Sequence, residues 1–355
     1  MRMTIGIGLI GCGTVGAAVA QRLLDEDHVA KRCGVSIELR AIATRTKRDR
    51  QGIPAELFTN DPYAIVNDPR IDIVVECAGG CSETADYVEA ALVRGAHVVT
   101  ANKDLIATQG PRLHALAHAS RSTLTYEASV CGAIPVLRVV RDSLAGDRIH
   151  SIAGVINGTT TAILSAMENG DEFPDALAQA QKRGYAEADP SNDVDGIDAA
   201  HKLAVLMQLA FGAAVTTQML PVCGISQISR RDAARARTLG YRVRLIAAAS
   251  RSAEGFVAGV SPQFVHDDHP FAQTSGPQNV VQIRSEDSGE ITLCGPGAGG
   301  AATASAVIAD VIHAARTIAQ ATDVARAMRP ALTAAGRIEP YFSAPLRVWG
   351  EERAA

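Results

Sequence analysis

Short β-rich runs and segments with helical spacing alternate along the first third of the chain. The strand-like runs are residues 4–10, 35–44, 71–76, 97–101 and 123–127, and the helical segments include residues 17–24, 84–94 and 111–119. Alternating or continuous apolar runs predict strands, whereas apolar residues three and four apart predict amphipathic helices. Strands that alternate with helices are typical of a doubly wound parallel sheet, so we predict an α/β fold for this part.

The pattern changes near residue 129. Three further strand-like runs, IHSIAGVIN, RVRLIAAAS and VVQIRS, are interleaved with helical and polar segments, which predicts a second, mixed α+β domain. An amphipathic segment then follows a late glycine cluster at 295–300, and we expect it to return to the first domain. We therefore predict a first domain over residues 1–128, completed by about 303–355, and a second over 129–302.

One helix-forming stretch, IDAAHKLAVLMQLAFG, is apolar around nearly its whole circumference, which is typical of a buried helix. Asp198 and Lys202 lie four residues apart within it, so they share one face. Ionisable side chains are rarely buried without a partner, and buried pairs concentrate at functional sites. A lysine in such a setting is suited to general acid/base catalysis, and we assign that role to Lys202.

The segment before this helix is acidic, with five carboxylates from Glu187 to Asp198 and no cation until Lys202. Its centre, DVDG, resembles the middle of a calcium-binding EF-hand loop. Lys202, however, occupies the last ligand position, where a bidentate glutamate is required. The loop is better suited to a cationic, amino-bearing substrate held beside the lysine.

The composition is that of a globular chain long enough for two domains, with 355 residues of which 47% are hydrophobic and 20% charged. A formal net charge of −4, without a dense run of Lys and Arg, argues against a nucleic-acid partner and favours a small-molecule substrate. No apolar run is long enough to span a bilayer. The seven cysteines lack paired C-x-x-C spacing, so we expect free thiols in a reducing cytoplasm.

A glycine turn, GCGTVG, follows the first strand and opens the first helix. Glycines in a strand–turn–helix unit let the helix N-terminus approach a pyrophosphate, which predicts a Rossmann-type dinucleotide-binding domain. The second strand ends in basic residues, so Arg45 favours the 2′-phosphate of NADP, while Glu38 within the strand keeps NAD as the alternative. The predicted contacts in the turn are Gly11, Gly13, Thr14, Val15 and Gly16.

Two other strand ends carry polar residues, in ECAGG and in TANK. Because open α/β sheets bind ligands at the carboxyl ends of their strands, we place Thr100 and Lys103 at the cofactor. The next segment, EASVCGAIP, supports two hypotheses: Cys131 as an acylating thiol, or Glu127 with nearby carbonyls as a site for a hard cation. Nothing in the sequence identifies a histidine base for Cys131, so the thiol is the weaker hypothesis.

Six segments, in the same order, resemble homoserine dehydrogenases. They extend over nearly all of residues 4–325 and are GLIGCGTVG, VVTANKDLIA, EASVCGAIPVLR, GVINGTTT, GYAEADPSNDVDGIDAAHKLAVL and GPGAGGAATASAV. The resemblance implies reversible hydride transfer between a nicotinamide cofactor and C4, linking L-homoserine to L-aspartate 4-semialdehyde in threonine and methionine biosynthesis. It also implies a homodimer formed through the second domain.

The same resemblance implies roles for single residues. Lys202 is similar to the family's catalytic lysine, with Asp198 binding the substrate hydroxyl, and Lys103 is similar to a second lysine near the nicotinamide and the substrate. Asp193 belongs to the family's acidic signature and could also serve as a cap or turn former. The implied substrate-binding residues are Glu187, for the amino group, Asp193 and Thr159.

The resemblance further implies a structural sodium ion and a set of glycines near the cofactor. The implied sodium ligands are the Glu127 side chain and the main-chain oxygens of Val130, Gly132 and Ile134. The implied glycines are Gly184, Gly297 and Gly299.

Three features depart from the family pattern. Thr161-Ala162 stands where the family often has Asn-Tyr, and Ala302 stands where it often has Pro, which concerns fine positioning of the substrate. The chain also ends before the position of a regulatory ACT domain, which predicts a short form that threonine does not inhibit.

Two other functions stay open. One is a dehydrogenase of another amino acid or semialdehyde, including an aspartate-semialdehyde dehydrogenase that acts through Cys131. The other is a protein that senses NADP(H) without turnover. The joint presence of Lys103, Glu187, Asp198 and Lys202 favours catalysis, because sensing does not need that set.

Overall fold

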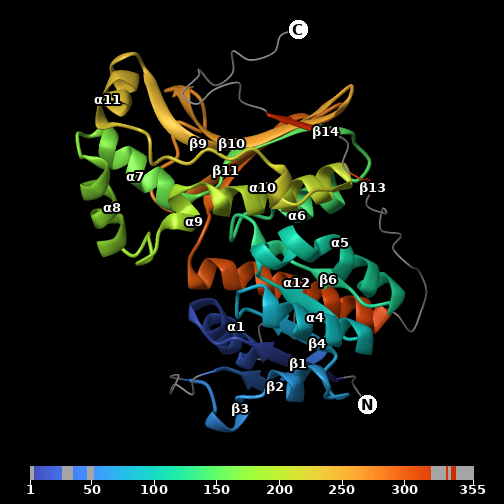
Figure 1. Ribbon diagram of the computed structural model, residues 1–355. Coiled ribbons are helices and arrows are strands. Elements are labelled where there is room, and N and C mark those ends of the chain that lie inside the picture. The colour runs from blue at the N-terminus through green and yellow to red at the C-terminus, as the bar shows by residue number, and fades with distance from the viewer. Residues whose placement is uncertain (1–3, 26–34, 46–51, 321–332, 335–336, 341–355) are drawn as a thin grey trace. The chain divides into compact units, whose positions relative to one another are not determined.

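The computed structural model describes residues 4–25, 35–45, 52–320, 333–334 and 337–340 (Figure 1). These residues fall into two compact units. The first runs to Pro135 and includes the helix that begins at Gly300, and the second runs from Val136 to Ala298 and includes the strand Arg337–Pro340. Each unit has its own six-stranded sheet.

The sheet of the first unit is parallel in all its strand pairs, with the order β3-β2-β1-β4-β5-β6. Its central strand, β1, is buried along almost its whole length, as is usual where helices cover both faces. The chain reverses direction across the sheet between β1 and β4, which confirms the predicted doubly wound α/β fold. The strands are β1 (Thr4–Ile10), β2 (Ser36–Ala43), β3 (Phe58–Thr59), β4 (Ile73–Glu76), β5 (His97–Thr100) and β6 (Leu124–Thr125).

The helices of this unit form two groups. α1 packs on α12, whereas α3, α4 and α5 pack successively on one another. They are α1 (Thr14–Leu24), α3 (Pro62–Val66), α4 (Ser82–Arg94), α5 (Lys103–Ala119) and α12 (Gly300–Gln320), with the 3-10 turns η1 (Ala55–Leu57) and η2 (Glu127–Ser129).

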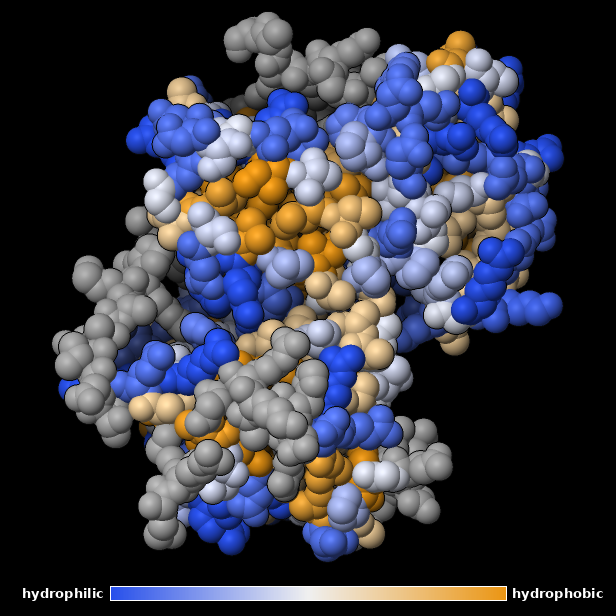
Figure 2. Space-filling model, turned by 180° about the vertical axis from the view of Figure 1, so that it is seen from behind, coloured by the Kyte–Doolittle hydropathy of each residue, from blue (hydrophilic) through white to orange (hydrophobic). Residues whose placement is uncertain are grey.

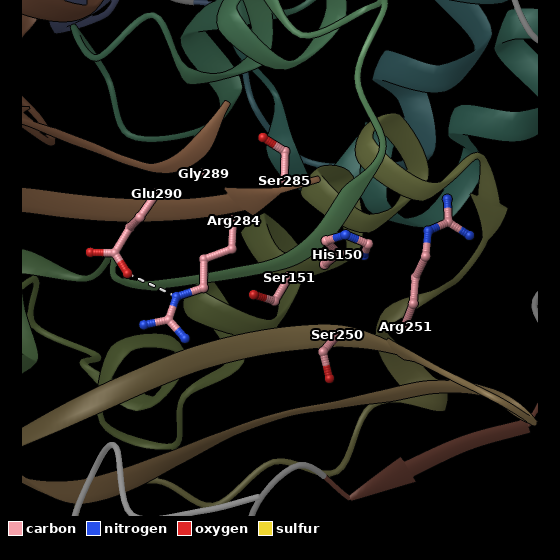
Figure 3. A pocket seen from close by; sticks show the side chains of 8 residues that line it. All are labelled: His150, Ser151, Ser250, Arg251, Arg284, Ser285, Gly289 and Glu290. Atoms are coloured by element: carbon pink, nitrogen blue, oxygen red, sulfur yellow. Dashed lines mark hydrogen bonds and ion pairs between the residues drawn. The ribbon is translucent and has the colours of Figure 1, made fainter. Parts of the chain in front are cut away.

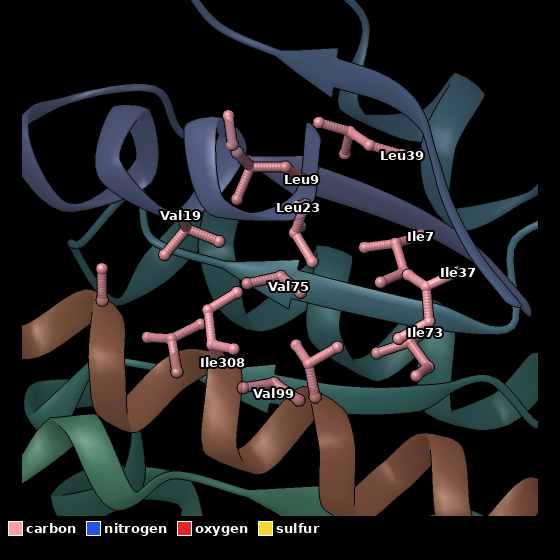
Figure 4. Close-up of a cluster of buried hydrophobic side chains, with 14 of the residues drawn as sticks. Ile7, Leu9, Val19, Leu23, Ile37, Leu39, Ile73, Val75, Val99 and Ile308 are labelled. Carbon is pink, nitrogen blue, oxygen red and sulfur yellow. The ribbon is translucent and has the colours of Figure 1, made fainter. Parts of the chain in front are cut away.

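The core of the first unit lies between the sheet and the α1–α12 pair (Figure 4). Ile7, Leu9 and Val75 from the strands meet Val19 of α1 and Ile308 of α12, and all five are buried. Burying each side chain of this size contributes about 1.5–3 kcal/mol. Helix α12 is therefore part of the same core, although its Ile308 follows Val75 by more than two hundred residues in the chain.

Helix α5 begins at Lys103, eight residues before the predicted start at Pro111. The side chain of Asn102 caps it by accepting a hydrogen bond from Leu105 N at 3.1 Å. Pro111 lies inside the helix and not in its first turn, where its missing N–H would have cost least. The strand end and the start of this helix are consequently adjacent, which places Lys103 at the edge of the sheet.

The sheet of the second unit has the order β12-β11-β7-β9-β10-β14. Its pairs are antiparallel except for the parallel pair β10–β14. The strands are β7 (Ile149–Val155), β9 (Tyr241–Ser252), β10 (Gly255–His266), β11 (Gln278–Ser285), β12 (Gly289–Pro296) and β14 (Arg337–Pro340), and a separate small sheet pairs β8 (Ala213–Ala214) with β13 (Thr333–Ala334).

Strand β14 corrects one expectation. We expected residues from about 303 to 355 to complete the first domain, and α12 does lie in the first unit. Arg337–Pro340, however, pairs with β10 in the second unit. The free edge of β10 offers a row of unpaired backbone groups, and a later strand satisfies them by pairing there.

The helices of the second unit include one that is buried around its circumference. That helix is α10, whose apolar residues from Ala199 to Phe211 are almost all buried, and the prediction of a buried helix is confirmed. The helical elements are α6 (Val136–Arg138), the π-helical turn η3 (Val139–Ser143), α7 (Gly158–Glu168), α8 (Phe173–Lys182), α9 (Ser191–Val194), α10 (Ile197–Phe211), η4 (Thr217–Met219) and α11 (Arg230–Thr238).

A buried ion pair joins α7 to β9. Arg244 Nη1 of β9 lies 2.8 Å from Glu168 Oε1 at the end of α7, and both side chains are almost completely buried. Burial lowers the pKa of Arg244, and the adjacent Glu168 carboxylate opposes that shift. Separating the two side chains would leave unpaired buried charges, which is costly. The ion pair therefore disfavours any shift of α7 relative to β9.

None of the helices in the described part of the chain is both long enough and apolar enough to cross a bilayer.

Candidate active site

Lys202 and Asp198 form the centre of a polar cluster in the second unit. Both belong to α10, and Lys202 Nζ lies 2.7 Å from Asp198 Oδ2. Lys202 also donates to the main-chain oxygen of Ile156, at 2.7 Å. The two side chains are only 12% and 11% exposed, so the charge pair lies at the margin of the core with a small open side. The spacing predicted this pair on one face of the helix, and the structure brings its two members together.

Asn157, which the sequence analysis did not single out, connects two of the predicted carboxylates. Its Nδ2 donates to Asp193 Oδ1 at 2.6 Å and to Asp198 Oδ2 at 2.8 Å. Its Oδ1 accepts from Thr160 N at 2.8 Å and caps α7. Because Thr160 N can only donate and carboxylates accept, these partners determine the orientation of the amide. The available signal was an asparagine directly before a helix, a residue type preferred at that position.

Asp193 lies in α9 beside this cluster. Burial raises the pKa of Asp193, the bond from Asn157 opposes that rise, and the nearby Asp198 charge adds to it. Two carboxylates that share one amide repel each other, and the hydrogen bonds and Lys202 offset that repulsion. The arrangement concentrates negative charge next to one cation.

Thr159 and the Gly184–Glu187 segment lie near one another. Thr159 is buried, and its hydroxyl donates to the main-chain oxygen of Tyr185 at 2.6 Å. Gly184 has a left-handed φ of 74°, where glycine is favoured. The Glu187 side chain is exposed, and its main-chain oxygen accepts from Gln181. Thr161, at one departure from the family pattern, binds Asn157 O through its hydroxyl at 3.0 Å and so faces its own helix.

Asn279 supports Lys202 from behind. Its Nδ2 donates to Ile156 O, at 3.1 Å, the same oxygen that accepts from Lys202. A Cβ at Gly297 would come within 2.2 Å of the Asn279 side-chain amide, which explains the glycine by packing alone. Contact between Gly297 and a cofactor stays a prediction.

The glycine turn of the first unit has the geometry of a dinucleotide site. Gly11 has a φ of 92°, and a Cβ there would lie 2.5 Å from Ala78 N. A Cβ at Gly16 would lie 2.1 Å from Gly11 O. A Cβ at Gly13, by contrast, would meet nothing within 4 Å, and no side chain caps the N-terminus of α1, which begins at Thr14. Open space over uncapped helix amides is what a pyrophosphate needs.

The late glycine turn approaches the same helix start. A Cβ at Gly300 would lie 2.9 Å from Thr14 Cγ2, and Arg22 Nη2 of α1 donates to Ala301 O at 2.9 Å. Gly299, the predicted residue, has a φ of 116° and makes the turn. The sequence predicted a cofactor contact at this turn, whereas the close approach of Gly300 to Thr14 follows from the structure.

Arg45 lies at the carboxyl edge of the first sheet. Ala43, the last residue of β2, accepts from Gly11 N at 2.8 Å, and Arg45 follows two residues later with its side chain exposed. Glu38 pairs with Arg40 at 2.8 Å and lies opposite Gly6, in the first half of the strand. Glu38, the acidic residue that would favour NAD, therefore lies away from the edge of the sheet where a ribose would bind. Lys47 and Arg48 lie outside the described residues.

Thr100 and Lys103 lie at the end of β5. Thr100 is fully buried, and its hydroxyl donates to Glu76 Oε2 at 2.5 Å. That hydroxyl therefore supports the sheet edge from inside, and its side chain is not open to a ligand. Lys103 begins α5, is about one-third exposed, and lies 3.7 Å from Asp104 Oδ1.

The four predicted sodium ligands share one buried turn of the first unit. Glu127 is 4% exposed, and Cys131 and Gly132 are consecutive residues with left-handed φ values of 57° and 53°. Across the described part of the chain no group of three or more His, Cys, Asp or Glu could hold a metal, so an ion here would depend on main-chain oxygens. Cys131 is fully buried, which argues against its thiol as a nucleophile.

A cavity of about 480 Å³ lies on the second sheet, lined by residues of β7, β9, β11 and β12 (Figure 3). Its cations have partners within the fold: Arg284 pairs with Glu290 at 2.8 Å, and Arg251 donates to Ile149 O and Phe211 O. None of the residues predicted for the site lines it.

Known proteins resemble the chain over both units. A family model described as "Homoserine dehydrogenase, NAD binding domain" matches residues 11–127, and one described as "Homoserine dehydrogenase" matches residues 135–312. A homoserine dehydrogenase of Neisseria gonorrhoeae is 39% identical over 317 residues, covering 88% of this chain and 73% of that one. One of Corynebacterium glutamicum is 43% identical over 321 residues, covering 88% and 72%.

Solved structures of the same kind also match. The crystal structure of a homoserine dehydrogenase from Thiobacillus denitrificans has a TM-score of 0.91 and 37% identity, covering 96% of this chain and 81% of that one. A hyperthermophilic archaeal homoserine dehydrogenase in complex with NADPH has a TM-score of 0.75 and 29% identity, covering 88% and 98%.

Proposed function

The chain belongs to the homoserine dehydrogenase family, and we propose that Lys202 moves the proton in its reaction while Asp198 holds that lysine and the substrate hydroxyl. The reaction links L-homoserine to L-aspartate 4-semialdehyde with a nicotinamide cofactor, in threonine and methionine biosynthesis. The observation that carries the assignment is the 2.7 Å pair of Lys202 Nζ and Asp198 Oδ2 in a mostly buried cluster.

The hydrogen bonds of Lys202 support this role. An ammonium has three N–H groups, and Asp198 Oδ2 and Ile156 O accept two of them. One remains for the substrate oxygen. In oxidation the neutral amine takes the hydroxyl proton of homoserine, and in reduction the ammonium returns it to the carbonyl oxygen of the semialdehyde. The bound cofactor supplies the hydride chemistry at C4.

The acidic residues around the lysine suit an amino-acid substrate. Glu187 presents an exposed carboxylate for the substrate ammonium, and Asp193 and Thr159 complete that part of the site. We propose that Lys103, which begins α5, binds near the substrate and the nicotinamide. A decisive test is the initial rate of homoserine oxidation at alkaline pH: cofactor binding without homoserine-dependent reduction would favour the sensor hypothesis.

We propose NADP as the preferred cofactor. Gly11, Gly13, Val15 and Gly16 would lie against the pyrophosphate at the N-terminus of α1, and Gly13 leaves the space for it. Arg45, exposed at the end of β2, would bind the 2′-phosphate. Arg45→Glu should weaken NADP more than NAD, measured as separate Kd values, with Arg231→Glu on the surface of α11 as the control. Equal losses for both cofactors would contradict the assignment.

We propose that the turn at 127–134 binds a structural sodium ion. All four ligands, the Glu127 carboxylate and the carbonyls of Val130, Gly132 and Ile134, are oxygens, as a hard cation prefers. We expect the ion to be structural and not catalytic. Replacing sodium by choline in the buffer should lower the melting temperature of the wild type but not of Glu127→Gln. The same change in melting temperature for the wild type and Glu127→Gln would count against the site.

We further propose a homodimer formed through the second sheet. Helices α7 and α10 lie on one side of that sheet in Figure 1, and Figure 2 shows apolar side chains gathered on the side seen from behind. Hydrophilic side chains surround them. Thr292 is exposed on β12, an edge strand of this sheet, so Thr292→Arg should shift the mass measured by light scattering to that of a monomer. An unchanged mass would place the interface elsewhere.

A cytoplasmic location is consistent with the six described cysteines, all of which are free thiols.

A further inference from the structure

Glu76 is a fully buried carboxylate at the end of β4. Oε1 accepts from Ala78 N at 2.7 Å and from Gly79 N at 3.0 Å, and Oε2 accepts from Thr100 Oγ1. Within the part of the chain that the structure describes, no lysine, arginine or histidine forms an ion pair with it. Burying a carboxylate costs free energy, so this position requires hydrogen-bond donors to both of its oxygens.

The donors belong to two neighbouring segments at the carboxyl edge of the first sheet. Ala78 and Gly79 lie in the loop 77–80 after β4, and Thr100 ends the neighbouring strand β5. Thr100 Oγ1 in turn accepts from Asn102 N, and Asn102 Nδ2 donates to Gly80 O at 2.6 Å. The bonds form a closed network that returns to the same loop.

The loop needs such support. Gly79 and Gly80 have left-handed φ values of 72° and 78°, and a Cβ on either would meet nothing within 4 Å. Glycines in open space restrict the backbone little, so the loop would sample many conformations without the carboxylate. The loop also touches the dinucleotide turn: Cys77 N donates to Ile10 O at 2.8 Å, and Ala78 lies against Gly11.

We propose that Glu76 is a positioning residue for the nicotinamide cofactor. Its carboxylate joins the loop 77–80 to the end of β5, so that the floor of the cofactor site at the switch point is rigid before the cofactor binds. Through Asn102, which caps α5, the same network fixes the start of the helix that carries Lys103. This inference rests on the proposal that the cofactor binds at this edge. Rigidity in advance matters because ordering a loop on binding reduces affinity.

Burial raises the pKa of Glu76, and the bonds from Thr100, Gly79 and Ala78 oppose that rise. We expect the bonding pattern to matter more than the charge, because a glutamine of the same shape keeps both backbone bonds and can bond Thr100 in the reverse direction. Its carbonyl would accept from Ala78 N and Gly79 N, and its amide would donate to Thr100 Oγ1.

The test compares Glu76→Ala with Glu76→Gln in the full chain. Kd for NADPH is measured by fluorescence titration, and kcat and KM for homoserine are measured with the primary deuterium isotope effect on hydride transfer. We expect Glu76→Ala to raise the Kd about tenfold or more, the size expected from losing bonds to a charged acceptor. We expect the isotope effect of Glu76→Ala to rise as well. We expect the Kd of Glu76→Gln for NADPH to stay within about threefold of the wild-type value.

Two results would overturn the inference. One is a folded Glu76→Ala with wild-type Kd and isotope effect, and the other is a folded Glu76→Gln as impaired as Glu76→Ala. If Glu76→Ala fails to fold, Thr100→Val removes only one donor and should still raise the Kd, whereas an unchanged Kd would reject the proposal. Wild-type binding of NADPH without homoserine turnover would instead reject the proposed reaction and leave this inference standing.

Discussion

Asn157 donates at 2.8 Å to Asp198 Oδ2, the same oxygen that accepts from Lys202 at 2.7 Å. The amide thus prevents Asp198 from rotating away from the lysine, and its second bond, to Asp193, fixes the distance between two repelling carboxylates. Asn157 does not need to touch the substrate to affect the reaction.

Lys202→Ala should lower kcat by roughly a hundredfold or more, because the general acid/base is lost. Cofactor binding should survive, since the dinucleotide turn lies in the other unit. Steady-state kinetics and NADPH titration measure the two effects. Lys182→Ala, at the exposed end of α8, is the matched control, and turnover like that of wild type in Lys202→Ala would refute the assignment.

Asn157→Ala should move the acid limb of the kcat/KM pH profile to higher pH. The bond from Asn157 lowers the pKa of Asp193, so its loss allows burial and the Asp198 charge to raise that pKa further. Melting temperatures over the same pH range separate this shift from a loss of folded protein. An unchanged limb in a folded variant would show that the amide has no part in positioning.

Glu187→Gln should raise KM for homoserine by about tenfold and change kcat far less, because the carboxylate binds the substrate ammonium in both ground and transition states. The measurement is steady-state kinetics with saturating NADP. Glu254→Gln, in the turn between β9 and β10, provides the control. A fall in kcat with KM unchanged would assign Glu187 to the chemical step instead.

Gly297→Ala should lower both stability and kcat. The new Cβ would overlap the buried Asn279 amide, which holds Ile156 O and through it Lys202. Overpacking of this kind costs about 1–3 kcal/mol, visible as a lower melting temperature. Gly146→Ala is the control, because a Cβ there meets nothing within 4 Å. Equal melting temperatures for the two variants would contradict the packing.

Glu76→Gln should gain stability relative to wild type as the pH rises. Burial holds the pKa of Glu76 above the ordinary glutamate value of 4.5, so the folded state binds the proton more tightly than the unfolded state. Wild-type stability therefore falls as the pH rises from that value through the pKa of the folded state. Glutamine does not titrate, so the stability of Glu76→Gln lacks this pH dependence. Melting curves of both proteins from pH 4.5 to 8.5 test this, and parallel curves would contradict it.

Local patterns in the sequence were sufficient to predict much of the fold of this protein. The alternation of apolar runs determined the parallel sheet, and the apolar circumference of 197–211 determined the buried helix with Asp198 and Lys202 on one face. Such features follow from the periods of strand and helix, which are local properties of the chain. The glycine turn was readable for the same reason, since strand, turn and helix are consecutive in the sequence.

Only the tertiary structure decided which distant groups meet. Asn157 reaches Asp193 and Asp198 across 36 and 41 residues, Glu76 meets Thr100 across 24, and β14 joins β10 and not the first sheet. These contacts depend on how whole elements pack and on which buried donors and acceptors need a partner. A hydrogen bond between distant residues leaves no period in the sequence, so physical pattern alone identified the lysine and its carboxylate but not the amide that holds them.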